Sequence, residues 1–245
     1  MKNKLKPILF SPEMVEAIVN NRKTQTRRIC KHQYWSFSEW LDFSKNRVHK
    51  KSDPNVSSRY QVGDILWIRE SWNYNDDLEE PYVYKQKHAE EFLPEYQNRW
   101  KWKPSIHMPF EAARIFLKVI AIQVERLQNI SNEDAIAEGI KPLLMSRQQI
   151  IEQGQLYQNY FQNGKFMDGL PPFWSFNSLW CKINGGESWE SNPWVFAYEF
   201  ELLKSVQGTC SVCGCTDIDC KRCIEKTGHA CCWENVEETI CSACR

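Results

Sequence analysis

The distribution of the cysteines restricts most strongly how this chain can fold. The chain has 245 residues and 11 cysteines, and nine of these lie after residue 209. Cysteine at this density in a reducing compartment indicates metal binding rather than disulfides. A segment of about 40 residues cannot build much core alone, so bound metal would fold it. We therefore expect one domain over residues 1–204 and a Cys-rich metal-binding module over residues 205–245.

Two Cys-x-x-Cys pairs in this tail have the spacing of a zinc ribbon, in which two such pairs close a tetrahedral thiolate site. They predict a structural zinc bound by Cys210, Cys213, Cys241 and Cys244. The cysteines that remain leave a second metal or an iron–sulfur cluster open. Residues 205–245 hold six acidic and four basic residues, which favours a protein partner or a structural role over phosphate binding.

The composition of the whole chain supports a folded core. Apolar residues make up 42% of the chain and aromatic residues 13%, which is enough for one large domain. No apolar run approaches the length of a membrane span, and no signal-peptide region follows Met1. We therefore expect a soluble cytoplasmic protein without a membrane partner. The first 60 residues hold 13 Lys and Arg against 5 Asp and Glu, which suits a nucleotide or polyanionic ligand.

Hydrophobic periodicity predicts both strands and helices. Strands are expected at 7–10, 65–70, 82–85, 113–127 and 194–202. Helices are expected at 12–19, 131–138, 147–162 and 173–183. The strands are separated by loops and few helices lie between them, which argues against a doubly wound sheet. The pattern favours an α+β fold, a small mixed β-barrel with flanking helices. The stretches near 31–60 and 141–190 read as insertions, the first as either a packed surface loop or a lid.

The most basic stretch of the chain follows the first expected helix. Residues 22–28, RKTQTRR, carry four cations and no acidic residue. On charge alone this is a solvated basic strand. In an extended conformation its side chains alternate between two faces, with Thr24, Thr26 and Arg28 on one and Lys23, Gln25 and Arg27 on the other.

Residues 21–28, NRKTQTRR, resemble the signature G-x-K-T-x-T-x-R of the ASCH family, whose members are PUA-like β-barrels linked to RNA and modified nucleosides. Residues 62–66 and 130–139 resemble the family's Gly-Asp strand entry and its capped helix. The order of these and further motifs up to residue 203 is similar to a phage- and prophage-borne subgroup. The chain departs from the signature at Asn21, where the family often has Gly.

This resemblance implies an activity and a set of residues. Small bacterial members of the family are amidohydrolases that remove the acetyl group of N4-acetylcytidine. By motif, their catalytic Lys, Thr and Glu fall on Lys23, Thr26 and Glu138, and the signature Arg falls on Arg28. The tail also resembles a Cys-rich module of phage-encoded proteins, which adds three candidate metal ligands: Cys215, Cys220 and Cys231.

The chemistry is consistent with these roles. A threonine hydroxyl needs a base to become a nucleophile, and a lysine serves when its pKa falls toward neutrality. Neighbouring arginines lower the pKa of Lys23, whereas the helix C-terminus before it raises it; we expect repulsion and burial to win. Glu138 lies at the negative end of a helix dipole, four residues after Asp134, and both effects suit a general acid for the departing amine. The alternative is an ordinary surface Glu near a helix end.

Three functions stay open from the sequence. The first is the amidohydrolase. The second is a non-catalytic module that binds RNA or a modified base, and the third is a structural phage-associated protein that docks through its tail. Six residues are expected to contact the ligand: Arg22, Thr24, Arg27, Arg28, Trp102 and His107. Trp102 is flanked by two lysines and could stack on a base. His107 could equally be a hydrogen-bonded loop residue. Trp67 and Trp194 are expected in the core.

Overall fold

The computed structural model describes residues 5–30, 41–42, 47–48, 58–76, 81–88, 101–161 and 169–203, together with residues 224 and 227. It divides into two compact units, which we call the first and the second unit. The first comprises Met1–Glu16, Asp64–Lys118 and Leu202–Arg245, and the second comprises Ala17–Gly63 and Val119–Glu201. No helix within the described ranges is long and apolar enough to cross a membrane.

The cysteines predicted to bind zinc lie outside the described residues: Cys210, Cys213, Cys215, Cys220, Cys231, Cys241 and Cys244. The zinc site and the boundary of its module at residue 205 therefore stay predictions. Within the described part of the chain, no group of three or more His, Cys, Asp or Glu side chains could hold a metal ion.

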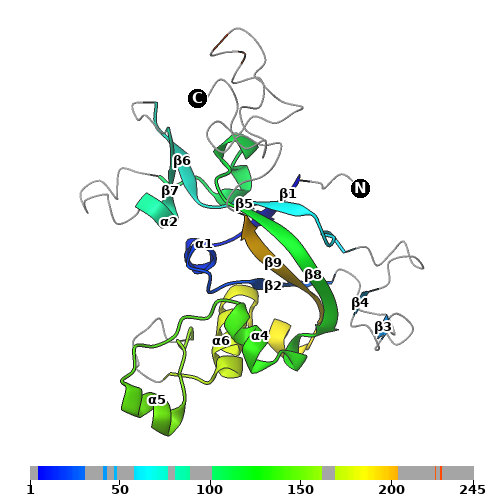
Figure 1. Cartoon of the computed structure of the whole chain (residues 1–245), viewed down its shortest axis with the longest axis vertical. Coiled ribbons are helices and arrows are strands. Elements are labelled where there is room, and N and C mark those ends of the chain that lie inside the picture. The colour runs from blue at the N-terminus through cyan, green and yellow to red at the C-terminus, as the bar shows by residue number, and fades with distance from the viewer. Residues whose placement is uncertain are drawn as a thin grey trace. The chain divides into compact units, whose positions relative to one another are not determined.

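Five strands form a mixed sheet in the order β1-β5-β8-β9-β2 (Figure 1). They are β1 (Leu5–Leu9), β5 (Ile65–Arg69), β8 (Phe116–Arg126), β9 (Trp194–Leu203) and β2 (Gln25–Ile29). β1 runs parallel to β5, while β5–β8 and β2–β9 pair antiparallel. The α+β class is confirmed. Among the described residues β1 and β2 are edge strands, so this sheet is open and does not close into the expected barrel.

In the first unit, β5 carries the buried residues Leu66, Trp67 and Ile68, as a strand with two covered faces requires. The hairpin of β6 (Trp72–Tyr74) and β7 (Tyr82–Tyr84) follows, and α2 (Lys85–His88) continues from it. Two 3₁₀ helices, Ser105–His107 and Phe110–Ala112, precede β8. Trp72, Tyr84, Met108 and Ala112 form a buried cluster in this unit.

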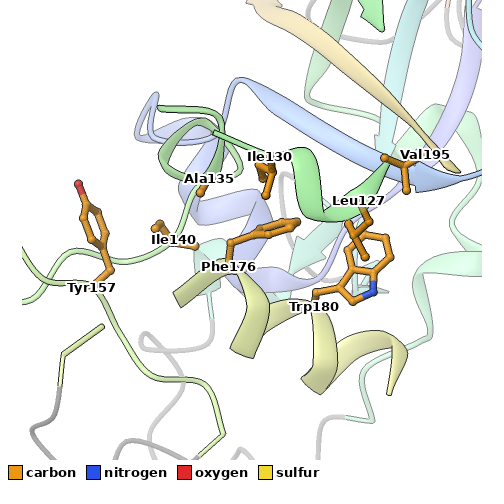
Figure 2. Packing of buried hydrophobic residues seen from close by; sticks show 8 residues of the cluster. All are labelled: Leu127, Ile130, Ala135, Ile140, Tyr157, Phe176, Trp180 and Val195. Atoms are coloured by element: carbon orange, nitrogen blue, oxygen red, sulfur yellow. The ribbon is translucent and has the colours of Figure 1, made fainter. Parts of the chain in front are cut away.

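The second unit contains β2, most of β8, most of β9 and the helices that follow β8 in the chain. The helices are α4 (Asn132–Ala137), α5 (Arg147–Gln153), α6 (Pro172–Asn184) and α7 (Gly186–Glu190), after a 3₁₀ helix at Leu127–Asn129. The strand β3 (Leu41–Asp42) pairs antiparallel with β4 (Arg47–Val48). Phe176 and Trp180 project from α6 toward Leu127, Ile130 and Val195 in the core of this unit (Figure 2).

Two elements differ from their predicted form. The helix expected over 147–162 ends at Gln153, because Gly154 adopts a positive φ of 75°, and Tyr157 instead bridges Pro142 and Leu170. Ile150 and Ile151 are 39% and 70% exposed, and no residue of this helix is buried. β9 forms where its alternation predicts it, yet Val195–Tyr198 are buried on both faces, since the α6 cluster covers Val195 and Tyr60 packs on Tyr198.

Candidate functional site

Residues 22–28 connect the end of α1 (Pro12–Val19) to β2, and backbone hydrogen bonds fix the position of this segment. Pro12 opens α1 as predicted, and Asn21 ends the turn after it with a positive φ of 54°. The backbone amides of Arg22 and Lys23 both donate to the carbonyl of Ala17, at 2.7 and 3.0 Å. The Thr24 amide donates to Ala137, at 2.8 Å, so the stretch is fastened to the end of α4 before β2 begins.

Lys23 and Glu138 form a buried ion pair across 115 positions of the chain. Lys23 Nζ donates to Glu138 Oε2 at 2.7 Å and to the Glu138 carbonyl at 2.8 Å. The two residues are 2% and 6% exposed, so little solvent screens this pair. Their backbones also form an isolated antiparallel bridge.

The end of α4 delivers Glu138 to this position, as the sequence predicts. Ser131 caps α4 by accepting from the Asp134 amide at 3.0 Å, and Glu138 is the C-cap residue. Gly139 follows with a φ of 88°, which an L side chain rarely adopts. A Cβ on Gly139 would lie 2.7 Å from Lys23 Cβ, so glycine is needed for both its conformation and its lack of a side chain.

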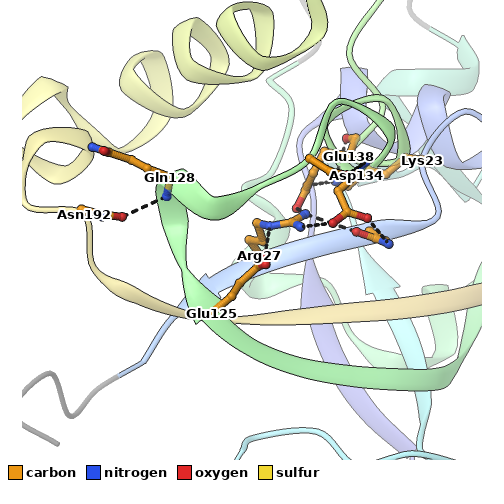
Figure 3. A network of polar contacts seen from close by, with 9 residues as sticks. Lys23, Arg27, Glu125, Gln128, Asp134, Glu138 and Asn192 are labelled. Carbon is orange, nitrogen blue, oxygen red and sulfur yellow. Dashed lines mark hydrogen bonds and ion pairs between the residues drawn. The ribbon is translucent and has the colours of Figure 1, made fainter. Parts of the chain in front are cut away.

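Arg27 lies at the centre of a group of carboxylates (Figure 3). Its Nε donates to Glu125 at 2.8 Å, its Nη2 to Asp134 at 3.1 Å and its Nη1 to Glu138 at 3.1 Å. Gln25 also donates to Asp134, at 3.0 Å. The shared partners confirm that Gln25 and Arg27 lie on the face of the strand that was predicted for them and Lys23.

Burial governs the electrostatics of the pair. Burial lowers the pKa of Lys23 below its ordinary value, although the adjacent Glu138 carboxylate raises it, and the charges of Arg28 and Arg27 lower it further. The predicted direction is confirmed, but the arginines contribute less than burial does. Burial also opposes the charge of Arg27, yet Glu138, Glu125 and Asp134 together raise its pKa. A lysine in this setting gives up its proton more readily than one in water.

Glu125 is a member of the site that the sequence reading missed. It lies near the end of β8, and burial raises the pKa of its carboxyl although Arg27 lowers it. The end of β8 is held by Asn192, whose side chain accepts from the Gln128 amide at 2.9 Å (Figure 3). In the sequence, Glu125 is a charged residue near the end of a strand rich in Ile and Val. This position could have indicated a buried carboxylate, but a charged residue at a strand end is usually exposed to solvent.

Thr26 and Arg28 lie on the other face of β2. Thr26 is 2% exposed and pairs in register with Tyr198, whose hydroxyl lies 2.8 Å from Ser58 Oγ. Burial lowers the pKa of Arg28, while the carboxylate of Glu138 opposes that change. Among the described residues, no hydrogen bond joins the Thr26 hydroxyl to Lys23 or Glu138. The structure thus brings two of the three predicted catalytic residues into contact.

The other predicted residues take varied positions. Arg22 is half-buried and donates to the Gly139 carbonyl at 3.3 Å, whereas Thr24 is exposed. Trp102, half-buried, and His107, exposed, belong to the first unit, whereas Lys23 and Glu138 belong to the second.

The two tryptophans expected in the core differ in burial, and a buried thiol lies next to the site. Trp67 is buried as expected, and Trp194 is half-buried, with the guanidinium of Arg126 4.4 Å from the centre of its ring. Cys30 follows β2, and burial raises its pKa to about 12, so it is an unreactive thiol.

Comparisons with protein-family models, with curated proteins and with solved structures find no match to this chain. The functional assignment therefore depends on the chemistry of the residues and on the motif resemblance. Chemically, a desolvated lysine beside a carboxylate can accept a proton and return it, and the pair is shielded from water by its burial.

Proposed function

We propose that the chain is an ASCH-like amidohydrolase that removes the acyl group from an N-acylated nucleoside of the N4-acetylcytidine type. The site uses Lys23 as base, Thr26 as nucleophile and Glu138 as the partner that returns the proton. The proposed fold is PUA-like, with a zinc-bound Cys-rich tail, in a cytoplasmic protein that acts on RNA or a modified nucleoside and could meet a protein partner through its tail.

The buried contact between Lys23 and Glu138 carries this proposal. Two charged side chains from distant parts of the chain are desolvated together, and such an arrangement costs stability unless something else favours it. Strongly perturbed ionisable groups concentrate at functional sites, although structural ion pairs also perturb pKa values. The motif resemblance points to the same Lys and the same Glu, and it does so independently of the contact between them.

The proposed reaction proceeds through an acyl-enzyme intermediate on Thr26. The neutral amine of Lys23 takes the proton of the Thr26 hydroxyl while Thr26 Oγ1 attacks the acyl carbon. The tetrahedral intermediate collapses as the leaving nitrogen takes that proton, and an acyl-Thr26 ester forms. Water then hydrolyses the ester with Lys23 again as base, which releases the carboxylic acid.

In this proposal Arg28 and Glu138 take different parts in the reaction. Arg28, on the face of β2 that carries Thr26, is the nearby cation that could stabilise the oxyanion. Both oxygens of Glu138 accept hydrogen bonds here, so its proton would come from Lys23 during the reaction. The reaction also requires a Thr26 rotamer in which the hydroxyl reaches Lys23.

A second candidate is a module that binds a modified base or RNA without turnover. It is favoured by the absence, within the described ranges, of a hydrogen bond between the Thr26 hydroxyl and either partner of the pair. In such a module the Lys23–Glu138 pair would be structural, and the half-buried Arg28 would contact the ligand.

Incubation with N4-acetylcytidine, followed by chromatography for cytidine and acetate, separates the two candidates. We expect turnover by the wild-type protein and none by Lys23→Ala or Thr26→Ala. Turnover that survives both substitutions would reject these residues as the catalytic pair. Binding of the nucleoside without any turnover would favour the module.

A further inference from the structure

We infer that Arg27 is the positioning residue of the site: it holds the Glu138 carboxylate so that one oxygen alone is directed at Lys23. This inference extends the proposed function, since it concerns the same carboxylate. It also gives Arg27 a role different from the ligand contact that its place in a basic stretch predicts.

The environment of Arg27 excludes a direct role in ligand binding. The residue is 3% exposed, and its Nε, Nη1 and Nη2 atoms all donate to carboxylates. The planar guanidinium offers donors in a rigid fork, so three acceptors fix its orientation as well as its position. Its guanidinium carbon also lies 6.0 Å from the centre of the Phe176 ring, on the core helix α6.

The division of the Glu138 oxygens shows what this fixed guanidinium does. Oε1 accepts from Arg27 Nη1 at 3.1 Å and Oε2 accepts from Lys23 Nζ at 2.7 Å. A carboxylate held at one oxygen can rotate little about its last torsion, so the distance from Oε2 to Lys23 is set by Arg27. The positive charge of Arg27 also offsets part of the attraction that keeps the Lys23 proton in place.

Glu125 and Asp134 complete the arrangement from two other elements. Glu125 comes from β8 and Asp134 from the first turn of α4, and they hold Arg27 Nε and Nη2. Arg27 therefore ties β2 to both β8 and α4, and the geometry of Lys23 and Glu138 depends on all three. Loosening Arg27 should therefore disturb the pair through the Glu138 carboxylate that both cations contact.

The test measures the pKa of Lys23 directly, by the pH dependence of the ¹³Cε chemical shifts of labelled lysines in the full-length protein. Lys23→Arg assigns the signal because it removes one resonance. In Arg27→Gln we expect the Lys23 pKa to rise, since a neighbouring positive charge is lost and Glu138 turns wholly to Lys23. Arg27→Lys keeps the positive charge but loses the planar guanidinium donors, so it should raise the Lys23 pKa less than Arg27→Gln does. Arg27→Lys also keeps the test decisive if Arg27→Gln does not fold.

Arg126→Gln is the control, because Arg126 follows Glu125 on β8 and donates to the Asn192 carbonyl. It should leave the Lys23 pKa unchanged. If the wild-type protein turns over substrate, Arg27→Lys should lower kcat roughly 100-fold with KM unchanged. A Lys23 pKa that stays the same in folded Arg27→Lys, or in Arg27→Gln where that variant folds, would overturn the inference. That outcome is independent of turnover, so the proposed function can fail separately.

Discussion

Replacement of Gly139 by alanine should disturb the site through its backbone. Gly139 follows the C-cap residue Glu138 and has a φ of 88°. An added methyl group would lie 2.7 Å from Lys23 Cβ and 3.1 Å from Ala17 Cβ. Both neighbours belong to packed structure, since Lys23 is 2% exposed and Ala17 is 2% exposed. The methyl group therefore cannot be accommodated unless Lys23 or the end of α4 moves.

Two costs add in this variant. A left-handed conformation costs an alanine about 1–2 kcal/mol. Overpacking of a filled interior costs about 1–3 kcal/mol more. The free energy of unfolding should therefore fall by about 2–5 kcal/mol in Gly139→Ala. The displacement also lengthens the contact from Lys23 to Glu138, so turnover should fall as well.

Gly185→Ala is the control, since Gly185 has a φ of 85° but, apart from its chain neighbours, no atom of the described residues lies within 4 Å of an added Cβ. It should lose about 1–3 kcal/mol, the conformational cost alone, because a ψ of 156° places it in a region almost restricted to glycine. Urea unfolding followed by tryptophan fluorescence measures both variants at one pH. Equal losses in the two variants would refute the close packing of Gly139 against Lys23.

Three further predictions concern the cap, the missed carboxyl and the tail. Ser131→Ala should lower the free energy of unfolding by about 1 kcal/mol in urea titrations, since the Asp134 amide loses its acceptor; no loss would contradict the cap. Burial raises the pKa of Glu125 above its ordinary 4.5, so its contribution to stability should fall as pH rises from 4.5 through the folded pKa. Relative to Glu125→Gln, the wild-type free energy of unfolding should then drop by at most about 1.4 kcal/mol per pH unit, and a difference that does not change with pH would count against the burial. Elemental analysis of the purified protein should find stoichiometric zinc that Cys210→Ser diminishes, and a metal-free protein with an intact tail would reject the zinc site.

Short-range sequence patterns were sufficient to predict most of the helices and strands. They also predicted some of the residues of the site, but not the contacts between them. Ser11 and Pro12 start α1, Ser131 caps α4, and the alternating pattern of β9 lies where it was predicted, because caps, proline and periodicity act within a few residues. Lys23 and Glu138 came from the motif resemblance. The contact between them could not be predicted, because the two residues are 115 positions apart in the chain and are brought together only by tertiary packing.

The features that were predicted wrongly from the sequence depend on contacts with distant parts of the chain. The helix expected to reach residue 162 stops at Gly154, and Tyr157 finds partners in Pro142 and Leu170 instead of a helix face. The predicted barrel depends on pairing between strands distant in the chain, and the described strands form an open sheet. Such long-range pairing leaves no periodicity in the sequence that encodes it.

By itself, the sequence determined the basic stretch after α1, the capped helix that ends at Glu138, and the faces of the strand on which Lys23 and Arg27 lie. These follow from periodicity and from the conformational preferences of single residues. Tertiary structure alone decided that Arg27 binds three carboxylates, that Glu125 is among them, and that burial rather than neighbouring arginines dominates the pKa of Lys23. Desolvation depends on how much protein surrounds a charge, and the fold alone sets that amount.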